Sequence, residues 1–86
     1  MSDERVGVYM PTIIKQDGFR IVIWPNDHLP PHVHVFKSDA EVKIELVEPR
    51  VFNVEGKISN KDLAKALNLV IEHQVELLEK WKEIHE

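Results

Sequence analysis

Residues 32–46 read HVHVFKSDAEVKIEL, with apolar and polar side chains alternating on both sides of the Ser38-Asp39 pair. A period of two is typical of a strand with one buried face. A two-residue turn at Ser38-Asp39 predicts a hairpin in which His32 lies opposite Glu45 and His34 lies opposite Lys43. The pairing depends on this turn, because a slip of one residue would move every side chain to the other face.

The same alternation extends the sheet in both directions from this hairpin. Toward the N-terminus, Asp17-Gly18 predicts a tight turn before a strand at residues 19–24. Toward the C-terminus, a short strand is expected at Val51–Val54. The sheet should therefore be antiparallel and contain four or five short strands.

Apolar residues change to a helical spacing after Ser59. Ser59 followed by Asp62 resembles a capping box, and apolar side chains recur every three or four residues as far as Trp81. We predict one long helix, Ser59 to Glu83, packed across one face of the sheet, because no second helix is available to cover its apolar side. The fold class is α+β. The predicted core consists of Val42, Ile44, Leu46, Leu67, Val70 and Trp81.

The composition indicates one small domain and limits its chemistry. Of the 86 residues, residues 1–9 form a polar N-terminal extension and residues 10–86 are expected to form a single α+β domain. The lack of cysteine excludes disulfides, a thiol nucleophile and thiolate-bound metals. A net charge of -4 disfavours non-specific nucleic-acid binding. No window approaches the roughly 20 apolar residues of a membrane span, so we expect a soluble cytoplasmic protein.

Three of the five histidines lie close together in the sequence. His32 and His34 are two apart on a strand and should project from the same face. The pair permits a site for a divalent metal such as zinc, completed by His28 or Glu45, a general acid–base pair, or anion binding with Lys43. The structural alternative is a half-exposed polar face whose imidazoles form hydrogen bonds with carboxylates on the next strand.

The remaining histidines and Gln74 differ in how close to this pair we expect them to lie. The rigid Pro30-Pro31 segment should keep His28 close to the two strand histidines. His73 ranks last as a site residue, since the helix and the histidine pair should occupy opposite faces of the sheet. Gln74, near the centre of the helix's apolar side, predicts a polar contact beneath the helix or an interface with another chain. His85 is expected to lie in solvent.

Several short motifs are distributed over most of the chain: Met10-Pro11-Thr12-Ile13, Asp17-Gly18-Phe19-Arg20, Asn26-Asp27-His28, Pro31-His32-Val33-His34-Val35, and Glu72-His73 with Leu77-Leu78 and Trp81. Together they resemble the prokaryotic family called domain of unknown function 4160. The resemblance implies no activity. It implies that His28, His32, His34 and His73 are motif positions. It also implies a gene neighbour from the family called domain of unknown function 2442, in suspected toxin–antitoxin pairs.

The first functional hypothesis is a small protein-binding component of a toxin–antitoxin-like two-gene module. Its partner would be a second copy of the chain or a small cognate protein. The sheet face that carries Arg20, Val22, Trp24 and Phe36 has no cover in the predicted fold. Monomers seldom expose a contiguous apolar patch of this kind, which favours a protein partner.

The alternative hypothesis is an enzyme that uses the histidine cluster. One form is a metal-dependent hydrolase. The other is a ribonuclease in which His32 and His34 act as acid and base, while Lys43 or Arg20 stabilises the developing negative charge.

Overall fold

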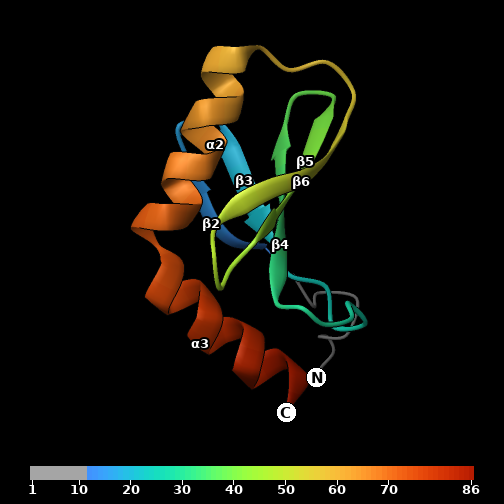
Figure 1. The fold of residues 1–86 in the computed structure, drawn as a ribbon, viewed down its shortest axis with the longest axis vertical. Helices are drawn as coiled ribbons and strands as arrows, with labels where there is room; N and C mark the ends of the chain where they lie inside the picture. The colour runs from blue at the N-terminus through green and yellow to red at the C-terminus, as the bar shows by residue number, and fades with distance from the viewer. Residues whose placement is uncertain (1–11) are drawn as a thin grey trace, which may run out of the picture.

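The computed structural model describes residues 12–86 and contains a five-stranded antiparallel sheet followed by two helices. Each strand pairs with the next one along the chain, so this part of the sheet is a meander (Figure 1). The α+β prediction is confirmed, whereas the expected extension at residues 1–9 lies outside the described residues. The strands are β2 (Thr12–Gln16), β3 (Phe19–Val22), β4 (His32–Lys37), β5 (Ala40–Glu45) and β6 (Arg50–Glu55).

The hairpin of β4 and β5 has the predicted register. His32 pairs with Glu45 and His34 pairs with Lys43 across the two strands. Ser38 begins the turn with a φ of 52°, in the left-handed region that tight hairpin turns require. The register turns Val33 and Val35 toward the core and leaves His32 and His34 on the opposite face.

The pairing of β5 with β6 contains a bulge at Phe52. Asn53 pairs with Lys43 and Val51 pairs with Ile44, so Phe52 between them has no partner on β5. A bulge re-aims the side chains beside it. The Phe52 ring lies against the His32 ring, on the face of the sheet that carries the histidines.

The C-terminal segment forms two helices, α2 (Asn60–Glu72) and α3 (Gln74–His85), instead of the single helix predicted from Ser59 to Glu83. The Ser59 cap is confirmed, since its hydroxyl accepts a hydrogen bond from the Asp62 N–H at 3.0 Å. The chain bends at His73, which has φ −108° and ψ 20°. No helix within residues 12–86 is long and apolar enough to cross a membrane.

Contacts with the sheet hold this bend in place. The Gln74 amide donates hydrogen bonds to the carbonyls of Leu46 and Val47 at 2.7 and 3.0 Å, which confirms the polar contact predicted beneath the helix. The His73 ring lies 3.1 Å from the Gln16 side-chain oxygen. In Figure 1, α2 lies along the sheet, whereas α3 continues past its end.

One hydrophobic core joins the sheet to both helices. Five of the six predicted core residues are buried, and Leu67 packs only at the edge. The helices are rotated slightly from the predicted orientation, so that Leu69 is buried in addition to Val70. The buried helical residues are Ala66, Leu69, Val70, Leu77 and Trp81.

The apolar patch expected on the opposite sheet face is smaller than predicted. Val22 is fully buried, and Phe36 is half-buried beneath the Arg20 guanidinium, which lies 5.0 Å from the ring centroid. Trp24 remains exposed at 38%. The expectation that this whole face is uncovered is therefore wrong for Val22.

Gly56 follows β6 and lies against the β4–β5 turn. Its φ is +84°, and a Cβ there would lie 2.6 Å from the Asp39 carbonyl oxygen and 3.0 Å from the Ala40 Cα. Both neighbours are backbone atoms that cannot rotate away. We expect Gly56→Ala to lower the free energy of unfolding by about 2 kcal/mol or more, as measured by urea denaturation.

Gly18→Ala is the matched control. Gly18 also has a positive φ, +82°, but the nearest atom to its added Cβ is the flexible end of Lys37, at 2.9 Å. The control should lose only about 1 kcal/mol, the cost of the left-handed conformation. Equal losses in the two variants would contradict the role of the close backbone approach at Gly56.

Candidate metal centre

The histidine pair lies where β4 begins, beside the loop of residues 23–31 that joins β3 to β4. A cleft of about 450 Å³ opens at this point. Its walls come from the loop, from β4 and β5, and from the bulged strand β6. The lining side chains include Asp27, His28, His32, His34, Lys43 and Phe52.

Three potential metal ligands converge in this cleft. One atom from each of Asp27, His32 and His34 lies within 4.8 Å of the other two. The Asp27 carboxylate is 3.1 Å from Nε2 of His34 and 3.7 Å from Nε2 of His32. Ligands that sit about 2.1 Å from a tetrahedral zinc ion lie about 3.4 Å apart, so the spacing fits a shared ion.

The other ring nitrogen of each histidine is held by a hydrogen-bond acceptor. Nδ1 of His34 lies 2.7 Å from the Glu41 carboxylate, and Nδ1 of His32 lies 2.9 Å from the Pro30 carbonyl oxygen. Both acceptors lack a proton to donate, so Nδ1 is the donor in each ring. This is the arrangement that orients metal-binding histidines, because it leaves the Nε2 lone pair for the metal.

The spacing between His34 and Asp27 requires a positive charge. If the ring is neutral, Nε2 of His34 directs a lone pair at a carboxylate oxygen 3.1 Å away. A proton on this nitrogen would remove the repulsion by forming an ion pair with Asp27, and a metal ion would remove it as well. Only a metal ion would also engage Nε2 of His32, which lies 3.7 Å from the same carboxylate.

The loop's own backbone fixes the Asp27 carboxylate. The Trp24 N–H donates to Asp27 Oδ2 at 3.1 Å, and the Asp27 N–H donates to the Trp24 carbonyl at 3.1 Å. Pro25 and Asn26 occupy the turn between them and are typical turn residues. Asp27 is thereby directed toward the histidines before any ligand binds.

Aromatic rings enclose the converging groups. The His32 ring meets Phe52 edge-on and lies 5.6 Å from Trp81 of α3, while the Trp24 ring meets His34 edge-on. The side chains of Asp27, His32 and His34 are only 8–13% exposed. Charge interactions are stronger in such a partly dry site than in water.

A family model described as domain of unknown function (DUF4160) matches residues 18–82. The chain belongs to this family. The match spans all three converging groups and confirms the resemblance noted in the sequence. The description of DUF4160 assigns no activity. No curated protein and no solved structure matches the chain.

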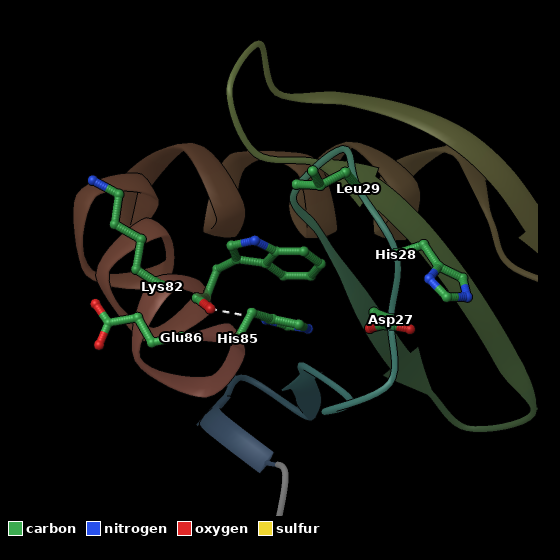
Figure 2. Close-up of a pocket in the computed structure, with 7 residues that line it drawn as sticks. Asp27, His28, Leu29, Lys82, His85 and Glu86 are labelled. Atoms are coloured by element: carbon green, nitrogen blue, oxygen red, sulfur yellow. Dashed lines mark hydrogen bonds between the residues drawn. The ribbon is translucent and has the colours of Figure 1, made fainter.

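The other metal ligands predicted for this DUF4160 chain lie outside the converging group. His28 is exposed, and Figure 2 shows its ring on the opposite side of the loop from His85. Glu45 instead forms an ion pair with Arg50 at 3.0 Å. The hydrogen bond that the guanidinium donates to this carboxylate, and then the carboxylate's charge, raise the pKa of Arg50 above its ordinary value.

The C-terminal histidines of the DUF4160 chain have other contacts. His73 lies at the bend of the helices beside Gln16 and is not part of the cluster. His85 stacks on Trp81 with ring centroids 3.7 Å apart, and its Nδ1 lies 2.8 Å from the Trp81 carbonyl. The expectation of a solvated His85 is wrong, because the residue is half-buried and its ring stacks on Trp81. The end of α3 also forms one wall of a second cavity of about 510 Å³ (Figure 2).

Sequence reasoning did not identify two contributors to the DUF4160 cluster as site residues. Glu41 lies diagonally across the hairpin from His34, two residues before Lys43, which pairs with His34. The predicted register therefore already placed Glu41 within reach of His34. Asp27 is part of the quoted Asn26-Asp27-His28 motif, where either of the last two residues is a possible ligand. The turn at Pro25, which favours Asp27, was the signal available in the sequence.

Proposed function

We propose that the side chains of Asp27, His32 and His34 bind a divalent transition-metal ion such as zinc, and that the bound ion serves a hydrolase. The observation that supports this most directly is that the two nitrogens of each histidine ring have different neighbours. In both histidines Nδ1 is occupied by an acceptor, whereas Nε2 points toward the same carboxylate.

This arrangement favours metal binding over direct proton transfer by the histidines. A general acid or base must present a titrating nitrogen to the substrate. Both nitrogens of His34 are engaged by carboxylates, and the residue is only 6% exposed. The acid–base ribonuclease considered from the sequence would require His34 to break one of these contacts.

Three protein ligands suit a hydrolytic metal centre. A tetrahedral zinc ion with three protein ligands keeps its fourth position for water, whose pKa it lowers to about 7. The cleft provides room for a substrate beside that position. The chemistry would be addition of the resulting hydroxide to an electrophilic centre of the substrate.

Zinc binding by the purified, untagged protein tests the proposal. We expect about one zinc ion per chain in equilibrium dialysis followed by elemental analysis, with release by a chelator. His32→Ala removes one ligand and should weaken zinc binding by about 100-fold or more, since loss of an outer contact alone costs 10–100-fold.

His73→Ala is the matched control, because it removes a half-buried histidine that lies outside the cluster. It should bind zinc as the wild type does. A wild-type protein that stays zinc-free at micromolar zinc, or equal losses in the two variants, would refute the metal centre.

A second function, binding to another protein chain, is supported by exposed apolar side chains beside the helix bend. Ile71 of α2 and Val75 of α3 are 49% and 71% exposed. The partner would be a second copy or a small cognate protein, as in a toxin–antitoxin-like pair. Sedimentation should show a complex, alone or with the product of the neighbouring gene, and Val75→Asp should weaken it.

A further inference from the structure

We infer that the substrate of this centre is a small phosphate ester with an apolar organic group, bound between the metal and Lys43. The inference rests on the proposed metal centre and adds the substrate class. It comes from the charges that the cleft leaves unbalanced, the position of one lysine, and the apolar wall beside it.

Lys43 is placed to bind an anion next to the metal. It lies on β5 directly opposite His34 and is half-buried in the wall of the cleft. It forms no ion pair with a carboxylate of residues 12–86, although glutamates flank it on both sides of the same face. Glu41 is engaged by His34, and Glu45 is engaged by Arg50.

The charge balance of the cleft favours an anionic ligand. A bound dication and Lys43 would bring three positive charges against the two negative charges of Asp27 and Glu41. The ion pair of Glu45 with Arg50 contributes no net charge. A phosphoryl group supplies the missing negative charge, and its several oxygens can contact the metal and the ammonium group at the same time.

The rest of the cleft fits a small apolar group and not a nucleic acid. Phe52, Leu29 and Pro30 provide the apolar part of the lining. A volume of about 450 Å³ is in the range of small-molecule sites. The net charge of -4 over the whole chain opposes a long phosphate backbone.

The implied reaction is hydrolysis of the ester. A bond forms between the oxygen of the metal-bound hydroxide and phosphorus. The bond between phosphorus and the ester oxygen breaks, its electron pair leaves with the organic group, and that oxygen takes up a proton from water. The products are inorganic phosphate and an alcohol.

Calorimetric titration of the zinc-loaded full chain with phenylphosphonate tests the inference, because the carbon–phosphorus bond of this probe cannot be hydrolysed in this way. We expect Lys43→Ala to weaken phenylphosphonate binding about tenfold or more, with the zinc content unchanged. Phe52→Ala should weaken phenylphosphonate binding but leave methylphosphonate binding unaltered.

Lys37→Ala is the matched control, since Lys37 lies at the far end of β4 beside Phe19. It should bind phenylphosphonate like the wild type. Unchanged phosphonate binding in Lys43→Ala would overturn the inference alone. A wild type that binds no zinc would overturn the metal centre and this inference with it.

Discussion

His34→Ala is expected to lower the free energy of unfolding by about 3 kcal/mol and to abolish zinc binding. His34 is 6% exposed and links the carboxylates of Asp27 and Glu41. Without the imidazole, Glu41 loses a hydrogen-bond donor, Asp27 loses its closest ring contact, and a cavity remains between the two carboxylates in a partly buried site. Removing one member of such a network is costly because the other members stay desolvated and unpaired.

The prediction separates the structural role of His34 from its role as a ligand. Urea denaturation in the presence of chelator measures the metal-independent part. His34→Asn places an amide donor near the position of Nδ1, within reach of Glu41, and should recover part of the stability without recovering zinc binding. An alanine variant as stable as the wild type in chelator would show that the carboxylates do not depend on this ring.

The second large effect is expected in the core, for Leu77→Ala. Leu77 is fully buried in α3 and belongs to the cluster that joins both helices to the sheet. Truncation should cost about 2–5 kcal/mol through lost burial and the cavity left behind. For a small domain with roughly 5–15 kcal/mol of stability, this is a large fraction of the total. The denaturation midpoint gives the measurement.

Leu29→Ala provides the same chemical change at a site that is 77% exposed. Its effect should stay within about 0.5 kcal/mol. If both variants unfold at the same urea concentration, α3 does not contribute to the core as the structure indicates.

The hairpin could be predicted from sequence because its signals are local and agree with one another. Alternation places the histidines on one face, and the two-residue turn at Ser38-Asp39 fixes their partners on β5. The structure reproduces this pairing residue by residue. The cap at Ser59 was predictable for the same reason, since both participants lie within one helical turn.

The helix bend depends on contacts that no local pattern contains. Residues 57–86 include no glycine or proline, so nothing in their sequence marks the break at His73. The bend is held by Gln16 and by the carbonyls after β5, which are far away along the chain. The choice of Asp27 over His28 as the third converging group is set by a local turn instead, in which the loop folds back on Trp24 three residues earlier. The signal of this turn in the sequence was not weighed, and Asp27 was missed for that reason.

The three side chains of the proposed metal centre all come from the segment between Asp27 and Glu41. The two hydrogen-bond acceptors that orient the histidine rings come from the same segment. Closing so short a loop costs little chain entropy, and structures with local contacts form quickly. The hairpin can therefore assemble the donor set before α2 and α3 dock on the sheet. Trp81 would reach His32 only when α3 docks, and it then completes the enclosure of the His32 ring. The choice of ligands therefore depends on contacts that are close in the sequence, whereas their shielding from water depends on a contact with the distant helix α3.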